Sequence, residues 1–546
     1  VAFVVGRDDD DDFHGNTVII RPHHRTALAF ERANAYSIVP MTSRVAAGFG
    51  STIWRGAFLA GVALAVFVVA ALAARWRPLW YDELFTLYVA SEASLGATLR
   101  ALLAGADTNP PVDYVLRHAS LALLGDSAMT FRLPSALAFV GGLFAIYAFV
   151  RRRTGFVAAA AAFALPILSV ATYFSYEGRA YALLFASAPV ALWAWQRATE
   201  RERPAARLLT LFLALCLGPY SHYFGVLNFV PIAVGEGWRS YRRRTLDAGI
   251  LGTVAAACIA TLGLLVFARS ATVMKQGFWA SGYRAADIPG YYTGLLGWAG
   301  WAWVVALALA ACVAMLDRRS RTEAAQRGTL PQHEVVAASV LALTPVSAFM
   351  LAGWVTGALA AKYAIAFVPG VAILFGYLLS VVENWRRSAA LLGLGALTLL
   401  GLGRFATEAL AYREDVPMPM RLAALLPQGS TLPIAFDSPH LFLETVYYQP
   451  RFANGRFQYP MDAATALAVR GFNNDEIALR GLTTIKPLNV ADYREFLLHN
   501  REFLVVFSRD FWPGLVLALQ RDGYCLQPLA EVDTTVLLHA LPGCRR

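Results

Sequence analysis

Charge is the scarcest property of this sequence. Only 15% of the 546 residues are charged, whereas 57% are hydrophobic, and the mean hydropathy is +0.49. Soluble globular chains are about 25% charged. The composition therefore excludes a disordered chain, a fibrous protein and an ordinary soluble enzyme. Many near-continuous apolar runs of bilayer-spanning length indicate a polytopic α-helical membrane protein instead.

Cysteine is also rare, and its spacing excludes a cysteine-based metal site. The five cysteines form no CxxC pair and no Cys/His pattern of a zinc centre. Cys216, Cys258 and Cys312 lie in apolar runs, so we expect small core residues there. Cys525 and Cys544 lie in the polar C-terminal part, where they form a disulfide only if that part is outside the cytoplasm.

The net charge of +10 does not indicate a nucleic-acid-binding face, because the basic residues lie in short clusters between apolar runs. Cytoplasmic loops of membrane proteins carry such clusters. With the N-terminus inside, all five fall on the cytoplasmic side: Arg151–Arg153, Arg197 to Arg207, Arg239 to Arg244, Arg318 to Arg327, and Arg386 with Arg387.

The apolar runs predict about eleven spanning helices. The stretch 207–237 is short for two spans. The predicted spans are 56–74, 132–150, 155–173, 180–196, 207–221, 222–237, 246–268, 291–316, 335–355, 363–382 and 388–408.

Three segments lie outside this pattern. Residues 1–54 are predicted to be a disordered cytoplasmic tail, unless translation starts at Met41 and only the segment upstream of it is an error of the gene start. The run from Gly56 is predicted to be a retained first span and not a cleaved signal peptide. Residues 112–125 are too short to span, so we expect a flat helix on the outer interface with Arg117 and His118 facing headgroups or a groove. Residues 411–546 predict a small extracytoplasmic α/β domain with strands within 431–439, 501–510 and 534–541.

Few charged residues escape the cytoplasmic clusters, and these lie at predicted outer helix ends. Asp82 and Glu83, beside Trp80, are either solvated acids in an interfacial belt or a general base. Three further groups are candidate functional residues that also have a structural explanation. Glu177 and Arg179 could form an ion pair, His222 could be a structural histidine, and Lys362 could be a snorkelling lysine. Their coincidence on one face suits chemistry on a lipid-linked phosphate, which the cations would hold.

Seven motifs follow one another in an order that resembles a known family. They are WYDE, DTNPPVDY, GDSAMTFRLPS, RRRTG, SYEGRAYAL, SHYFG and KYAIAFVPG. The series, covering about residues 55–385, resembles the GT-C class of membrane glycosyltransferases. The resemblance is greatest to the protein O-mannosyltransferase and aminoarabinose-transferase superfamily, in its bacterial family 39 and Rgt-like members.

The resemblance implies inverting sugar transfer from a polyprenyl-phosphate donor to an envelope glycan, lipid or protein acceptor, on the outer face of a bacterial plasma membrane. Asp82 then matches the base, with Glu83 beside it, and Arg179 and Lys362 match phosphate ligands. The remaining residues expected at the site are Asn109, Asp113, Glu177, Tyr181, His222 and Tyr363.

The sequence departs from the family at three positions, because many relatives have Arg at Lys362, His at Asn109 and Tyr at Asp113. Lysine keeps the charge but lacks the bidentate fork of arginine. Some relatives bind a divalent metal near the acidic loop, which this sequence neither requires nor excludes. A transporter or flippase of lipid-linked sugars and a non-catalytic envelope assembly protein remain the alternatives, although no internal repeat supports the transporter.

Overall fold

The computed structural model describes most of the chain and divides it into two compact units, Val1–Phe58 and Leu59–Arg546. The second unit contains most of the helix bundle and the whole of the C-terminal sheet. The described residues are 41–200, 205–268, 278–316, 330–422, 425–426, 429–450 and 455–543. The predictions for residues 1–40, for Cys544 and for parts of the basic clusters lie outside them.

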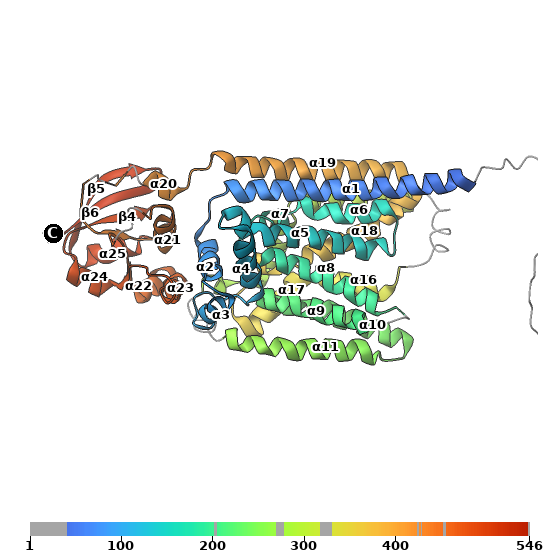
Figure 1. Ribbon diagram of the computed structural model, residues 1–546, viewed down its shortest axis with the longest axis horizontal. Coiled ribbons are helices and arrows are strands. Elements are labelled where there is room, and N and C mark those ends of the chain that lie inside the picture. The colour runs from blue at the N-terminus through green and yellow to red at the C-terminus, as the bar shows by residue number, and fades with distance from the viewer. Residues whose placement is uncertain are drawn as a thin grey trace, which may run out of the picture. The chain divides into compact units, whose positions relative to one another are not determined.

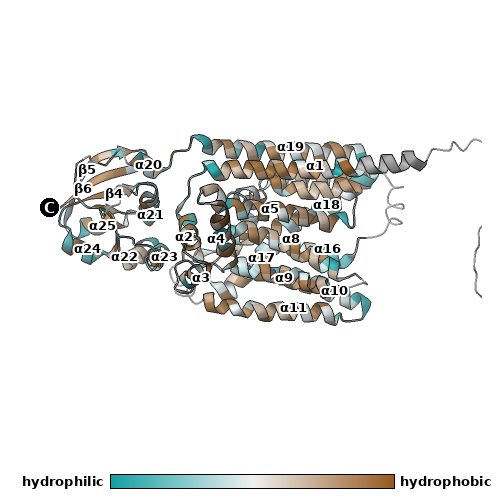
Figure 2. Cartoon of the chain, viewed as in Figure 1, coloured by the Kyte–Doolittle hydropathy of each residue, from teal (hydrophilic) through white to brown (hydrophobic). Residues whose placement is uncertain are grey.

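A bundle of apolar helices forms the larger part of this unit (Figure 1). Hydrophobic residues run along the helices, and hydrophilic residues gather at their ends (Figure 2). The main bundle helices are α1 Met41–Trp76, α5 Ala128–Arg151, α6 Phe156–Ala164, α8 Tyr181–Ala198, α9 Ala205–Ser221, α10 Phe229–Arg243, α11 Ala248–Thr261, α14 Trp298–Leu316, α16 Gln332–Ala342, α17 Thr344–Leu351, α18 Phe367–Trp385 and α19 Arg387–Ala411.

Among the described residues, five helices are long and apolar enough to cross a membrane, or up to seven if two bent pairs each count as one span. Two more, Phe156–Leu168 and Ala205–Ser221, are apolar but shorter. The protein is thus an integral membrane protein by its helices, and the figure of eleven spans stays a prediction.

Two predicted spans are broken, so their prediction as single helices was wrong. The run 291–316 consists of α13 Ile288–Leu296 and α14, which meet at 90°. Gly297 between them has φ +52°, a conformation that other residues rarely adopt. The run 335–355 bends by 56° between α16 and α17, where Pro345 lacks the N–H that would continue the helix.

The long loop after α1 contains three short helices: α2 Tyr81–Ala90, α3 Leu95–Leu103 and α4 Val112–Leu124. The predicted helix over 112–125 is therefore present. Its expected orientation was partly wrong, because Arg117 is fully buried and pairs with Asp113, with Nη2 2.8 Å from Oδ1. A buried guanidinium needs such a partner, and it found one on its own helix.

The C-terminal part is an α/β domain, as its strand patterns predicted. Its six strands form one sheet in the order β3-β2-β1-β4-β6-β5, with β1, β2, β3 and β4 parallel and β5 and β6 antiparallel. The three predicted strands are β1, β4 and β6, and the other three were not anticipated. The strands are β1 Ile434–Phe436, β2 Phe457–Met461, β3 Val490–Asp492, β4 Phe503–Ser508, β5 Tyr524–Val532 and β6 Thr535–Pro542.

Helices cover the faces of this sheet (Figure 1). One apolar core continues from the domain into α2, since Leu84 and Phe85 pack in the same cluster as Phe436 and Leu441. Cys525 is disulfide-bonded, whereas Cys216, Cys258 and Cys312 are free. The helices of the domain are α20 Met418–Leu422, α21 Pro439–Tyr448, α22 Ala463–Arg470, α23 Asn474–Leu482, α24 Tyr493–His499 and α25 Gly514–Arg521.

Candidate active site

Asp82 lies in the first turn of α2, at the wall of a cavity. The helix begins after the extended residue Trp80, and a carboxylate in a first turn is favoured by the helix dipole. Its side chain is 29% exposed, and Oδ2 lies 3.6 Å from Nζ of Lys362. Asp82 is therefore a charged oxygen acceptor that solvent and ligands reach.

Lys362 is held at this site by aromatic rings. It lies in the 3₁₀ turn η8 Ala361–Ala364, just before α18. Its Nζ is 5.6 Å from the ring centre of Trp80, 5.0 Å from that of Tyr181 and 5.9 Å from that of Trp279. Ring faces attract an ammonium group, so three rings and one carboxylate fix a cation beside Asp82.

Arg179 approaches the same cavity from the turn before α8 and is 9% exposed. Its Nη1 donates to the carbonyl of Asp82 at 2.9 Å, to Oγ1 of Thr86 at 2.6 Å and to Oδ2 of Asp107 at 2.9 Å. The guanidinium thereby connects the turn to α2 and to the loop before α4. Asp107, its ion-pair partner, was not singled out from the sequence because nothing local distinguishes it.

The cavity has a volume of about 540 Å³. Six of the ten residues expected at the site line it, namely Asp82, Asn109, Arg179, Tyr181, Lys362 and Tyr363. These residues come from α2, the loop before α4, the start of α8 and η8. The sequence motifs thus converge in space although they are spread over about half of the chain.

Glu83, the neighbour of Asp82, points away from the cavity. Its side chain is fully buried, and its carboxylate accepts from Arg132 Nη2 at 2.5 Å and Nε at 2.7 Å, with Arg77 at 3.4 Å. Burial alone raises a carboxyl pKa, but the two guanidinium groups hold the pKa of Glu83 below its usual range. Glu83 does not line the cavity, and its expected part in the site beside Asp82 stays a prediction.

A glycine permits this arrangement. The backbone N–H of Gly178 donates to Glu83 Oε1 at 2.5 Å, and a Cβ at position 178 would overlap the ring of Phe131. The turn that carries Arg179 therefore approaches α2 and α5 more closely than any other residue would allow.

Asp113, Glu177 and His222 also lie outside the cavity wall. Asp113 forms the internal pair with Arg117. Glu177 is buried, which raises its pKa to about 7, and its Oε2 has no hydrogen-bond partner among the described residues. The His222 ring packs against Tyr181 and Tyr363, with centres 5.6 and 5.1 Å apart. It therefore supports the aromatic rings that do line the cavity.

The C-terminal domain supplies the other wall of the cavity. Its contribution is rich in aromatic and acidic side chains, which the sequence analysis did not assign to the site. The ring of His440 stacks on that of Tyr81, with centres 4.0 Å apart. The cavity residues from this domain are Asp437, Ser438, Pro439, His440, Arg470, Phe472, Asn474, Asp475, Ala478, Asp510, Phe511 and Trp512.

The residues around Asp82 do not form a metal site. Within the described ranges, no group of three or more His, Cys, Asp or Glu side chains lies close enough to hold an ion. The nearest charged neighbour of the Asp82 carboxylate is the ammonium of Lys362, which would repel a divalent cation. The donor set therefore does not fit the metal of some relatives.

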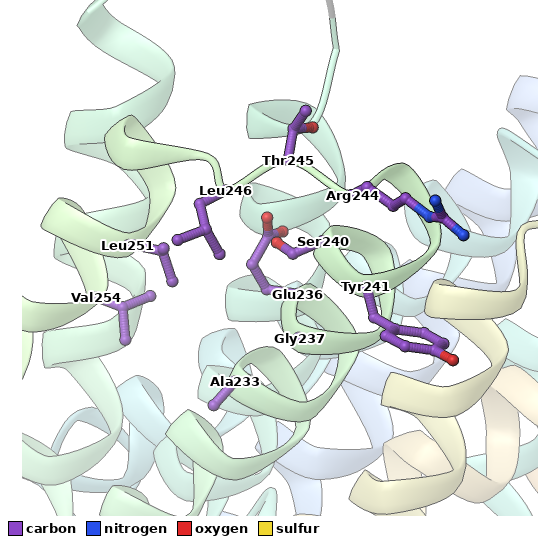
Figure 3. A pocket seen from close by; sticks show the side chains of 10 residues that line it. All are labelled: Ala233, Glu236, Gly237, Ser240, Tyr241, Arg244, Thr245, Leu246, Leu251 and Val254. Atoms are coloured by element: carbon purple, nitrogen blue, oxygen red, sulfur yellow. The ribbon is translucent and has the colours of Figure 1, made fainter.

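A second cavity, of about 350 Å³, lies between α10 and the start of α11 (Figure 3). Its only carboxylate, Glu236, is bound by Arg239 at 2.9 Å and by the indole N–H of Trp195 at 2.9 Å. These internal partners satisfy Glu236, so this cavity, although Arg244 lines it, does not combine an accessible carboxylate with a neighbouring cation as the first one does.

Comparisons with known proteins agree with this geometry. Residues 108–270 match the family model of dolichyl-phosphate-mannose-protein mannosyltransferase. None of the curated proteins matches the sequence. The crystal structure of ArnT from Cupriavidus metallidurans bound to undecaprenyl phosphate is similar in fold, with a TM-score of 0.57 and 14% identity over 89% of this chain and 98% of that one.

The apo structure of the same ArnT gives a TM-score of 0.55 and 16% identity, over 90% of this chain and 98% of that chain. At such identities the likeness concerns the fold. Together with the family segment it confirms the resemblance that the ordered motifs indicated. The chain thus contains a segment similar to the dolichyl-phosphate-mannose-protein mannosyltransferase family, within a membrane-protein fold similar to that of ArnT.

Proposed function

We propose that the protein is an inverting glycosyltransferase that moves a sugar from a polyprenyl-phosphate donor to a glycan, lipid or protein acceptor. One observation carries the proposal: the partly exposed carboxylate of Asp82 lies beside the ammonium of Lys362 in a single cavity. Sugar transfer from a lipid phosphate needs a base for the acceptor and a cation for the leaving group. The family segment and the fold support the same reaction class.

In the proposed reaction, Asp82 takes the proton of an acceptor hydroxyl while the oxygen of that hydroxyl attacks the anomeric carbon. The bond from that carbon to the phosphate oxygen breaks, a glycosidic bond forms with inversion, and the phosphate leaves with the electron pair. A phosphate monoester anion needs no protein acid to leave. Asp82 carries the proton at the end of the step, and the base function requires only one carboxylate.

The two cations have different roles in this scheme. Nη1 of Arg179 already serves three protein acceptors, so Arg179 mainly positions the first turn of α2. Lys362 is more exposed and has aromatic neighbours that do not compete for hydrogen bonds. We assign binding of the donor phosphate to Lys362. When the Lys362 ammonium moves from Asp82 to the phosphate, the carboxylate of Asp82 becomes available as the base.

The helix ends lie in two layers, one at the cavity and one at the opposite side of the bundle, and their charges support an outward-facing site in the plasma membrane. Helices α5, α8 and α18 each begin near the cavity and end in the opposite layer. In that layer Glu334 accepts hydrogen bonds from Arg153 at 3.0 Å and from Gln196 at 2.9 Å. Glu383 accepts the backbone N–H of Ala158 there at 3.0 Å. The described basic residues Arg151–Arg153, Arg239–Arg244 and Arg386 with Arg387 lie at the helix ends of that second layer. Basic loops mark the cytoplasmic side, so the proposed orientation puts the cavity and the C-terminal domain outside.

A transporter of lipid-linked sugars is the second candidate class. Such proteins place substrate-binding groups on broken helices near the middle of the bilayer. Here Asp82, Arg179 and Lys362 gather at helix ends beside an extramembrane domain. That placement favours group transfer at the membrane surface over passage through it, and it equally argues against an assembly protein without a catalytic centre.

The test is an Asp82→Asn variant in reconstituted membranes. We expect loss of sugar transfer by at least ~100-fold, the usual effect of removing a general base, with donor binding within about twofold because amide and carboxylate have the same size. Asp126→Asn serves as the matched control, since this acid is also in the outer loops but is exposed and outside the cavity. Undiminished transfer by the Asp82 variant would refute the assignment of the base.

A further inference from the structure

The topology of the C-terminal sheet points to a binding crevice of its own. Strand β1 has β2 on one side and β4 on the other, all parallel. The chain runs outward from β1 through β2 to β3 and then returns to the other side of β1 as β4. In open α/β sheets, ligands bind outside the carboxyl ends of the strands at such a reversal point.

The segments that leave this reversal point line the cavity of Asp82. Asp437 and Ser438 directly follow β1, and Asp510, Phe511 and Trp512 follow β4. Two separate arguments, one from strand order and one from the cavity, therefore identify the same crevice. It lies opposite the wall that carries Lys362.

Asp437 has an oxygen that the protein does not satisfy. The side chain is only 7% exposed, and Oδ1 accepts the N–H of Leu515 at 2.5 Å. Oδ2 has no hydrogen-bond partner among the described residues. An unpaired buried acceptor costs free energy, and hydroxyl donors of a ligand would relieve that cost.

Exposed aromatic rings adjoin this carboxylate. Trp512 is 59% exposed and Phe511 41% exposed, so both rings are accessible to a ligand in the cavity. The ring of Phe511 lies 5.4 Å from that of His440, which stacks on Tyr81 beside Asp82. The rings of Phe511, His440 and Tyr81 therefore follow one another from the crevice toward Asp82. Together with Trp512 they are called the aromatic shelf.

The two walls differ in charge. Three aspartates lie on the domain wall, Asp437, Asp475 and Asp510, together with Arg470, and Arg470 is engaged by Asp475 at 3.8 Å and by Glu476. On the membrane wall two cations balance two aspartates, since Lys362 pairs with Asp82 and Arg179 with Asp107. An anionic ligand would be repelled by the domain wall, whereas flat apolar rings with carboxylates suit a ring that carries hydroxyl groups.

We propose that the crevice at the carboxyl ends of β1 and β4, with the aromatic shelf, binds a saccharide that carries no acidic group, neutral or amino in type. The sugar ring stacks on Phe511 and Trp512 while its hydroxyls donate to Asp437 and Asp510. The identification of this saccharide as the acceptor rests on the proposed function. The claim that the crevice binds a saccharide does not depend on it.

The experiment measures saccharide binding to the full chain in lipid nanodiscs by saturation-transfer NMR and calorimetry, without donor. The probes are neutral, amino and uronate-containing oligosaccharides of equal length. We expect neutral or amino probes to bind and uronate probes not to bind. Trp512→Ala and Asp437→Asn each weaken binding by about tenfold, the effect of one stacking or hydrogen-bonding group.

Matched controls separate the crevice from the rest of the chain. Trp238→Ala removes an exposed tryptophan of α10, and Glu495→Gln neutralises an exposed acid of α24; both should bind saccharide like the native chain. Asp82→Asn should also bind normally, so loss of transfer and loss of the crevice are distinguishable. Absence of saccharide binding, a preference for uronates, or unchanged affinity in the Trp512 and Asp437 variants would each overturn the proposal.

Discussion

Arg132 decides which of two adjacent carboxylates faces the cavity. Asp82 and Glu83 are neighbours in one helical turn and look equivalent in the sequence. The guanidinium of Arg132, 49 residues later, binds Glu83 and draws it into the interior, which leaves Asp82 at the surface of the cavity. A sequence motif specified the pair of acids, and a distant partner decided which of them is exposed to the cavity.

Glu83→Gln tests this division. Breaking a buried ion pair by removing one partner costs roughly 3–5 kcal/mol, because Arg132 and Arg77 would remain buried with less compensation. We expect a clear fall in thermal stability of the purified protein, followed by circular dichroism, whereas Asp82→Asn keeps its melting temperature. A Glu83 variant that melts normally but has lost transfer would show that Glu83 acts in catalysis after all.

At the scale of elements, hydropathy located the helices well and their breaks poorly. The runs around α5, α18 and α19 were predicted within a few residues, because a long apolar run is a property of consecutive residues. The 90° break between α13 and α14 was missed. Glycine is common in membrane helices, so Gly297 alone carried no signal until its φ was known.

Gly297→Ala should destabilise the bundle by about 1 kcal/mol or more, since alanine at a positive φ is strained. No neighbouring atom comes closer than 3.7 Å to the added Cβ, so the effect is conformational. Gly300→Ala, inside α14 and with only ordinary contact at 3.9 Å, is the control and should be neutral or slightly stabilising. Equal unfolding temperatures for both variants in detergent would contradict the interpretation.

At the scale of the whole molecule, the C-terminal domain is part of the site. Tyr448 accepts the N–H of Leu79 at 2.6 Å, and Glu444 accepts the N–H of Tyr81 at 2.9 Å. Both contacts reach the residues just before Asp82 and join positions more than 360 apart in sequence. The domain therefore helps to set the position of Asp82, the proposed base.

Tyr448→Phe removes the acceptor of Leu79 and leaves a partly buried N–H unpaired, at a cost of about 1–3 kcal/mol. We expect faster hydrogen exchange across residues 79–85, measured by mass spectrometry on the intact chain. Tyr493→Phe is the control, because its hydroxyl bonds Asp522 within the domain and should not affect that segment. Unaltered exchange at residues 79–85 in the Tyr448 variant would mean that the domain does not hold the base.

The sequence by itself determined the membrane class, the family resemblance, the presence of a C-terminal α/β domain and six of the residues that line the cavity. Each of these follows from hydropathy, charge or motif order, which neighbouring residues or the order of the chain suffice to define. Tertiary structure alone decided that Glu83 and Asp113 are internal ion-pair partners and that the domain forms a wall of the site. The reason is physical: burial and pairing depend on contacts between segments far apart in the chain, and no local pattern records them.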